Sequence, residues 1–148
     1  MAHLDKGPDG GKFRAVAAAG VDATAGKWGD GDLVNVKIDA SGTFGLASAT
    51  DCDGVVLTTE GRTGTTAASY KKLIGGRKYT VFTFAELAEV GTGASPALSA
   101  GDKVYAAASG DVEVDAPVEG AIFIGYVMDS GDRMVINVNG KPVAAGGS

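Results

Sequence analysis

Short runs of alternating apolar and polar residues, separated by turn residues, dominate this chain. Residues 33–38 alternate with an imperfect period of two, and the turn residues 39–42 separate them from a second run at 43–48. Residues 103–107 and 111–114 repeat this design around an Ala-Ser-Gly turn at 108–110, whose glycine can adopt positive φ. The sequence therefore predicts two β-hairpins of related design.

The two predicted hairpins share a sequence pattern: a Gly-Asp pair, then an apolar run, then Ala-Ser-Gly. The Gly-Asp pair at 31 precedes its Ala-Ser-Gly by nine positions, and the pair at 101 precedes its copy by seven. A difference of two residues preserves which side chains point to each face of a strand. We interpret the repeated pattern as a recurring hairpin design, with internal duplication as the alternative.

Four further strands are predicted from enrichment in β-branched and aromatic residues, at 54–59, 77–84, 121–128 and 133–138. Turn residues 129–132 join the last two into a hairpin. Both faces of the strand at 121–128 are apolar, so we expect it to be buried on both sides or covered by another subunit. Strict alternation places Ile122, Ile124, Tyr126 and Met128 on one face, and Phe123 and Val127 on the other.

The chain is predicted to be a single small all-β domain, resembling a β-barrel or β-sandwich and built from hairpins. Its 148 residues suffice for one hydrophobic core. The expected organisation is a flexible N-terminal arm at 1–12, a β-rich domain at 13–139 and a flexible C-terminal tail at 140–148. Residues 85–90 are expected to continue the preceding strand, and 67–74 to form the one short helix.

Composition and charge exclude several classes of partner. Thirteen basic residues against eighteen acidic ones give a net charge of -5, and no stripe of Lys and Arg alternates with aromatic residues. A nucleic-acid partner is therefore not expected. The single cysteine, Cys52, cannot close an internal disulfide and is predicted to be a small buried apolar residue. No targeting or membrane segment is recognised, so synthesis in the cytoplasm and no membrane partner are expected.

Groups that could perform chemistry are sparse. The only histidine, His3, lies at the amino terminus, so no enzyme activity and no cofactor are predicted. The aspartate pairs at 30 and 32 and at 51 and 53 could offer oxygen ligands to calcium, but turn chemistry explains both, and no metal site is predicted. Residues 113–117 resemble the strand after the modified lysine of lipoyl and biotinyl carrier domains. Ser109 stands where that lysine would be, so no carrier function is predicted.

Two sets of side chains are candidates for contacts with partners. A loosely basic stretch that includes Arg62, Lys71 and Lys72 surrounds a long loop, and we predict that it docks on an acidic protein surface; a solvated loop is the alternative. Large aromatic side chains supply contact area, and five of them are predicted to pack in the core or between subunits. These are Trp28, Tyr79, Phe82, Phe84 and Tyr126.

Four stretches, 54–62, 79–90, 98–112 and 124–140, resemble the small capsid decoration proteins of tailed bacteriophages, especially those of phages infecting actinobacteria. The likeness covers roughly residues 15–140. It implies a β-rich virion protein, commonly a homotrimer, on the outer capsid surface. There it would clamp neighbouring capsomers at three-fold or quasi-three-fold positions, with the major capsid protein as its partner. The resemblance implies no catalytic activity. A tail or adaptor structural protein and a host-surface carbohydrate-binding β-domain are the alternatives.

Overall fold

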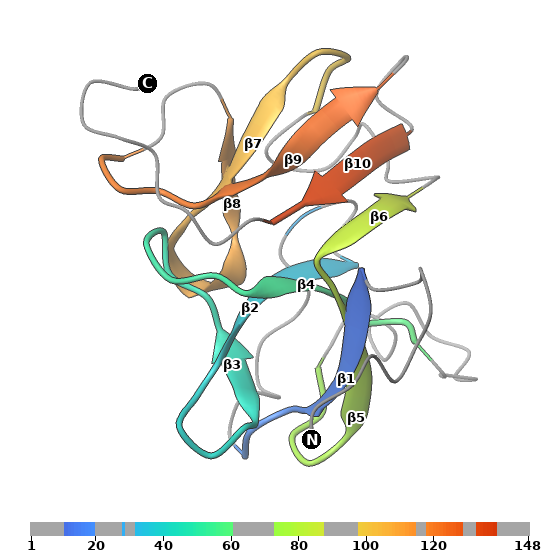
Figure 1. Ribbon diagram of the computed structural model, residues 1–148, viewed down its shortest axis with the longest axis vertical. Helices are drawn as coiled ribbons and strands as arrows, with labels where there is room; N and C mark the ends of the chain where they lie inside the picture. Colours follow the sequence, from blue (N-terminus) through green and yellow to red (C-terminus); the bar gives the residue numbers. More distant parts are fainter. Residues whose placement is uncertain are drawn as a thin grey trace, which may run out of the picture.

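Two antiparallel sheets of five strands each make up the fold (Figure 1). The computed structural model describes residues 11–19, 28, 32–60, 73–87, 98–114, 118–128 and 133–138. Within these ranges, the helical structure is the short 3-10 turn η2 (Ala108–Gly110). The prediction of an all-β fold is confirmed.

The first sheet, called here the curled sheet, has the strand order β1-β5-β4-β2-β3. At one end its two outer strands meet, because Ala17 and Phe44 form a parallel bridge and the Ala18 N–H donates to the Phe44 carbonyl at 2.9 Å. The sheet therefore curls around its own inner face. Its strands are β1 (Lys12–Val16), β2 (Leu33–Ile38), β3 (Phe44–Leu46), β4 (Gly54–Leu57) and β5 (Lys78–Phe82).

A hydrophobic core fills the curl. The rings of Phe44 and Tyr79 meet edge to face with centroids 5.9 Å apart, and the Tyr79 hydroxyl accepts a hydrogen bond from the Ile74 N–H at 2.9 Å. This bond satisfies the polar end of a ring that is otherwise buried. The buried members of this core are Ala15, Ala17, Val34, Val36, Phe44, Val56, Leu73, Tyr79 and Val81.

The second sheet has the order β6-β10-β9-β7-β8. The chain passes from one sheet to the other at Thr83, which separates β5 from β6, so the first five strands form the curled sheet and the last five form the second sheet. Figure 1 shows the second sheet above the curled sheet. Its strands are β6 (Phe84–Leu87), β7 (Lys103–Ala106), β8 (Val112–Val114), β9 (Phe123–Met128) and β10 (Arg133–Asn137).

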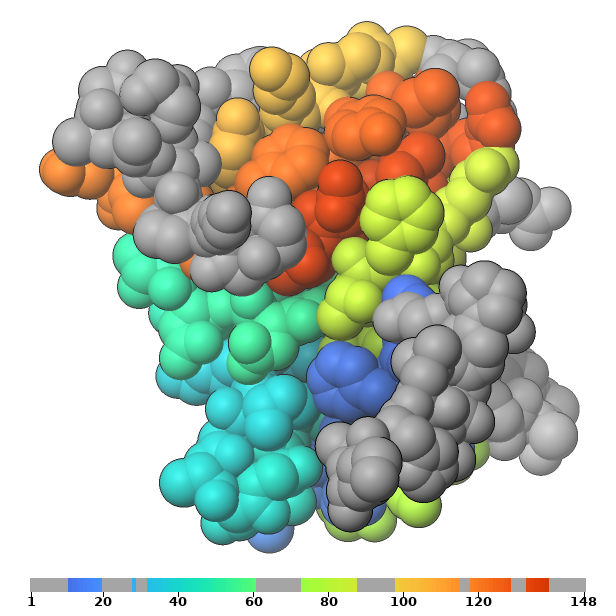
Figure 2. All heavy atoms as spheres, in the orientation of Figure 1, coloured from blue at the N-terminus to red at the C-terminus, as the bar shows by residue number. Residues whose placement is uncertain are grey.

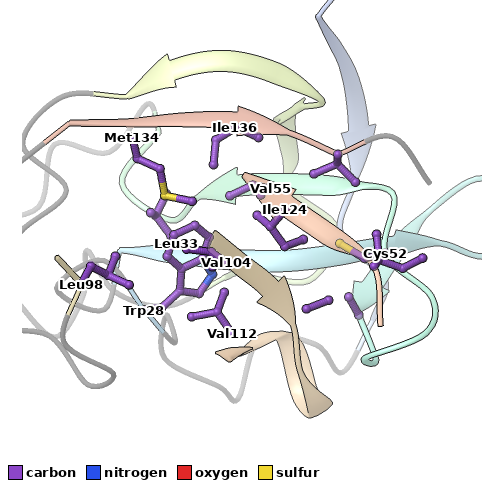
Figure 3. Close-up of a cluster of buried hydrophobic side chains, with 14 of the residues drawn as sticks. Trp28, Leu33, Cys52, Val55, Leu98, Val104, Val112, Ile124, Met134 and Ile136 are labelled. Carbon is purple, nitrogen blue, oxygen red and sulfur yellow. The ribbon is translucent and has the colours of Figure 1, made fainter. Parts of the chain in front are cut away.

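A second core joins the two sheets (Figure 3). Trp28 and Leu33 from the curled half pack with Val104, Ile124 and Met134 of the second sheet, all buried. Since alternate residues of β2 enter opposite cores, this strand is buried on both faces. The two halves are therefore packed across a continuous apolar layer.

Most of the predicted strands are present. Both hairpins with Ala-Ser-Gly turns are confirmed, as is the hairpin of β9 and β10. Residues 84–87 are extended as predicted, but the bend at Thr83 places them in the second sheet. In the predicted helix, Leu73 and Ile74 are not helical, and residues 67–72 lie outside the described residues. The C-terminal tail at 140–148 also lies outside them.

Two local features differ from the sequence prediction. Strand β1 was not predicted, and it begins at Lys12, inside the expected arm, where it pairs with β5 along its whole length. In β9 the alternation is broken, because the register with β7 shifts between Val104 and Tyr105 and leaves Ile124 as an additional residue. This irregularity puts Phe123 and Tyr126 on one face and Ile124 and Val127 on the other, so the predicted assignment of faces is wrong.

Candidate contact surfaces

The outer side of the second sheet carries a group of aromatic side chains, called here the aromatic face: Tyr105 of β7, Phe123 and Tyr126 of β9, and Phe84 of β6. The Tyr105 and Phe123 rings meet edge to face at 5.7 Å, and the Phe123 and Tyr126 rings stack at 6.3 Å. Val135 lies opposite Tyr126 on β10 and extends the apolar surface toward β6. Figure 2 shows β6, β9 and β10 side by side on the surface of the molecule.

Exposure distinguishes this face from the two cores. Phe84 is 64% exposed and Tyr126 is 38% exposed, whereas Phe123 and Tyr105 are half-buried against their neighbours. A phenylalanine that is 64% exposed gains little from burial within its own subunit. Large rings that stay exposed beside half-buried ones are the usual core of a protein contact surface.

Charged side chains surround the aromatic face. Arg133 of β10 donates to Glu86 of β6 at 2.7 Å, and Lys103 and Glu113 flank Tyr105 from β7 and β8. The two cations and two anions leave this face without net charge, although the chain as a whole carries -5. A neutral apolar centre with a polar rim is the common anatomy of protein interfaces.

The five predicted packing residues occupy different positions. Trp28 is fully buried between the sheets and Tyr79 is fully buried in the curl. Phe82 is half-buried at the end of β5. Only Phe84 and Tyr126 of this set are exposed, and both belong to the aromatic face. Tyr105 and Phe123 were not singled out from the sequence, because the irregular register of β9 hides their relation to Tyr126.

A second surface is built on β1 and β5 and is called here the basic ribbon. It carries Lys12, Arg14 and Lys78, all exposed, together with the half-buried Arg77. The Arg77 guanidinium lies 5.8 Å from the centroid of the Tyr79 ring. Cations therefore gather on one ribbon of an acidic chain.

Glu60 ties the segment after β4 to the basic ribbon. Its carboxylate accepts hydrogen bonds from the Thr80 N–H and hydroxyl, both at 2.6 Å, and forms an ion pair with Arg14. Arg77 donates to the Glu60 carbonyl at 3.0 Å. Burial raises the pKa of Glu60, but the Thr80 hydrogen bonds and the Arg14 charge outweigh it and hold this pKa below its ordinary value.

The predicted docking residues Arg62, Lys71 and Lys72 lie outside the described residues. The segment that carries them follows Glu60 and precedes Leu73, and Glu60 is fixed to the basic ribbon by the bonds above. Sequence reasoning missed Lys12 and Arg14 as members of this surface, because they lie far from the basic loop in sequence and strand β1 was not predicted.

The structure also places the side chains that could bind a metal ion or act as a nucleophile. Within the described ranges, no cluster of three or more His, Cys, Asp or Glu side chains could hold a metal ion. Burial raises the pKa of the Cys52 thiol to about 12, and its sulfur lies 3.6 Å from the Gly54 carbonyl oxygen. Such a thiol is chemically quiet while the core is closed. In the same ranges no helix has the length and apolar character to cross a membrane.

Comparison with known proteins gives no further assignment. No protein-family model matches this chain, and no curated protein matches it.

Proposed function

We propose that this chain is a structural virion protein that binds the outside of an assembled bacteriophage capsid. It bridges capsomers at three-fold or quasi-three-fold positions and stabilises the head, with the major capsid protein as its partner. The resemblance of four sequence stretches to capsid decoration proteins supports this proposal. The observation that carries it structurally is the aromatic face, where the exposed Phe84 and Tyr126 lie on the same side of one sheet.

The physical mechanism is stabilisation by selective binding. A ligand that binds only the assembled shell shifts the equilibrium away from the open shell by mass action. One subunit that touches two capsid proteins needs only modest affinity, because later contacts of the same molecule or assembly are effectively intramolecular. Many such contacts over the shell increase the cost of separating capsomers under the outward pressure of packaged DNA.

Particles lacking the protein provide the direct test. They should open at a lower temperature than complete particles, and addition of the purified protein should restore the opening temperature. The measurement is release of packaged DNA as a function of temperature, with and without osmotic shock. Depleted particles that are as robust as complete ones, or a protein located on the tail by electron microscopy, would contradict the proposal.

Variants of the aromatic face locate the contact. Phe84→Ala and Tyr126→Ala should reduce binding to depleted particles by roughly tenfold or more each, because interface aromatics dominate binding energy. Both side chains are exposed, so the melting temperature of the free protein should change little. Phe13→Ala is the matched control, since Phe13 is 37% exposed but belongs to the curled sheet. If Phe84→Ala, Tyr126→Ala and Phe13→Ala all bound depleted particles as well as wild type does, this face would be excluded as the contact.

A host-surface carbohydrate-binding role is the second candidate function. The exposed Tyr126 ring, stacked on Phe123 at 6.3 Å, offers the flat apolar platform on which sugar rings stack. A glycan array with wild-type protein and Tyr126→Ala separates the two roles. Glycan binding that depends on Tyr126, together with absent binding to particles, would favour this second function.

A further inference from the structure

The basic ribbon presents its cations on one outward side of β1 and β5, which lie side by side in Figure 1. Ala15 of β1 is buried in the core of the curl. The alternate positions of this strand therefore face outward, and they carry the exposed Lys12 and Arg14. Lys78 of β5 pairs with Val16, so it shares this outward side. Three exposed cations thus follow one side of two paired strands.

The charge of the basic ribbon is opposite in sign to that of the whole chain. Strands β1, β4 and β5 carry no acidic residue. With Arg77, which precedes β5, the ribbon has four cations, and Glu60 is the acidic residue bonded to them. The ribbon therefore holds a surplus of positive charge on a chain whose net charge is -5. Such a surface attracts negatively charged groups and increases the rate at which they bind.

Glu60 shows how this surface binds a carboxylate. Its two carboxylate oxygens accept hydrogen bonds from the Thr80 N–H and hydroxyl, both at 2.6 Å, and Arg14 supplies the opposite charge. Arg14 also donates to the Thr80 hydroxyl at 2.8 Å, so the donors around this carboxylate are fixed by one another. The centre of the ribbon is therefore a carboxylate site that a side chain of this protein occupies.

The two ends of the ribbon carry lysines without such a partner. Lys12 and Lys78 form no ion pair with any acidic side chain of the described ranges. Lys12 pairs with Phe82 and Lys78 with Val16, and both of these apolar side chains are half-buried. Four residue steps of about 3.3 Å, or roughly 13 Å, separate the two lysine positions along the strands. A partner that neutralises both lysines must therefore offer more than one carboxylate.

We propose that the basic ribbon docks an acidic polypeptide segment of the major capsid protein, with Lys12 and Lys78 binding its carboxylates on either side of Glu60. The identity of this partner rests on the proposed function, to which the ribbon adds a second contact besides the aromatic face. Nucleic acid fits this surface less well, because a chain with net charge -5 repels a phosphate backbone. Exposed ion pairs are individually weak and are screened by salt, so binding at the ribbon has low affinity and depends strongly on ionic strength.

A synthetic peptide tests the chemistry of the ribbon without the capsid. The probe is a short peptide of alternating Glu and Thr, and the control peptide has Gln in place of each Glu. Titration of the 15N-labelled full chain at low ionic strength should shift the amide signals of β1 and β5 with the Glu peptide only, and high salt should abolish the shifts. A short DNA duplex that bound the ribbon more tightly than the Glu peptide would make nucleic acid the occupant and overturn the inference.

Charge variants should change the affinity for the Glu peptide in opposite directions. Lys78→Glu should weaken binding by roughly five-fold or more, because it replaces an attraction by a repulsion. Glu60→Gln should strengthen binding by about two- to five-fold, because Arg14 then becomes available to the peptide. Lys37→Glu on β2 changes the net charge as much as Lys78→Glu does but lies outside the ribbon, so it should bind like wild type. Thermal unfolding checks that each variant is folded.

Depleted particles test the identity of the partner. Lys12→Glu and Lys78→Glu should each weaken particle binding by roughly five-fold and reduce its dependence on salt, whereas Lys37→Glu should do neither. Phe84→Ala should weaken binding at every salt concentration, because the contact that it removes is apolar. The two contacts are thereby measured separately.

The outcomes distinguish this inference from the proposed function. If wild type bound particles but the two ribbon variants bound them with unchanged affinity and salt dependence, the inference would be wrong and the proposed function would stand. Wild type that did not bind particles at all would contradict both. An acidic peptide that shifted no more signals than its Gln control would overturn the assignment of the ribbon as a carboxylate-binding surface, whatever the particles showed.

Discussion

The two Ala-Ser-Gly turns have the same sequence and serve different parts of the fold. In the first, at residues 40–42, the turn is exposed and local bonds hold it: the Asp39 carboxylate accepts hydrogen bonds from the Ser41 N–H at 2.9 Å and the Thr43 hydroxyl at 2.6 Å. A Cβ on Gly42 would meet no atom within 4 Å. These hydrogen bonds lie within the hairpin that the turn closes.

The second turn, η2, is a contact between the two sheets. The Gly110 N–H donates to the Ala47 carbonyl at 2.9 Å, and the buried Asn35 side chain donates to the Asp111 carbonyl at 2.8 Å. A Cβ on Gly110 would lie 3.0 Å from the Asn35 carbonyl oxygen. Both glycines have nearly the same φ, +79° and +78°. The backbone geometry of each turn is thus determined by its local sequence. The contribution of a turn to the stability of the fold depends on the residues that pack against it.

The largest expected effect is that of Gly110→Ala compared with Gly42→Ala. Both place an alanine at positive φ, which costs about 1–2 kcal/mol. Only Gly110→Ala also forces backbone and Val34 to move, which adds about 1–3 kcal/mol. Chemical denaturation should show the second turn to be the more sensitive. Equal losses of stability would mean that the inter-sheet contact contributes nothing.

Asn35→Ala should produce the next largest effect. It removes the Asn35 hydrogen bond to the Asp111 carbonyl, which costs about 0.5–1.5 kcal/mol, while that oxygen keeps the hydrogen bond from the Ala107 N–H at 2.9 Å. Asn137→Ala, at a half-buried position of β10, is the control and should remain within about 0.5 kcal/mol of wild type. The free energy of unfolding measures both. A smaller loss at Asn35 than at Asn137 would refute the role of this bond.

Substitutions of the two serines should have opposite signs. Ser109 has φ +59° and is the one non-glycine residue with positive φ among those described, whereas Ser41 is not in that region. Ser109→Gly relieves this conformation and should stabilise the protein by roughly 0.5 kcal/mol, while Ser41→Gly should destabilise it by a similar amount. Thermal unfolding of both variants checks the sign. Destabilisation by both would show that Ser109 is not strained.

The smallest effect is expected at Asp39, whose turn is fully exposed. The Thr43 hydroxyl, together with the Ser41 and Thr43 N–H groups, outweighs a small effect of burial and holds the pKa of Asp39 below its ordinary value of 3.8. A folded-state pKa that lies below the unfolded-state pKa stabilises the protein at pH values above the unfolded-state pKa. This stabilisation is lost as pH falls through the folded-state pKa. Asp39→Asn should therefore melt slightly below wild type at neutral pH, and the two curves should converge as pH falls through the folded-state pKa, below 3.8.

Asp51→Asn, at another exposed aspartate, controls at neutral pH for the loss of one surface charge. If the difference in melting temperature between Asp39→Asn and wild type did not change with pH, the charge of the Asp39 carboxylate would not be what stabilises this turn.

The sequence predicted the hairpins well because both are local. Alternation and the Ala-Ser-Gly residues specify each hairpin within about fifteen positions, and neither needs information from the other half of the chain. Strand β1 escaped prediction because a short segment beside glycine-rich sequence gains its order from pairing with β5, more than sixty residues away. The aromatic face escaped for a similar reason, since the irregular register opposite Ile124 is a property of two strands together.

The single crossing between the sheets at Thr83 has a consequence for synthesis. A ribosome that has released residues up to Phe82 has already delivered all five strands of the curled sheet, which can pair and enclose their own core without the remainder of the chain. Domains commonly fold from the amino terminus during translation. Until β9 and β10 emerge, the side of the nascent domain that holds Leu33 and Val55 stays uncovered. The growing chain therefore passes through a stage with one exposed apolar side, which the strands of the second sheet later cover.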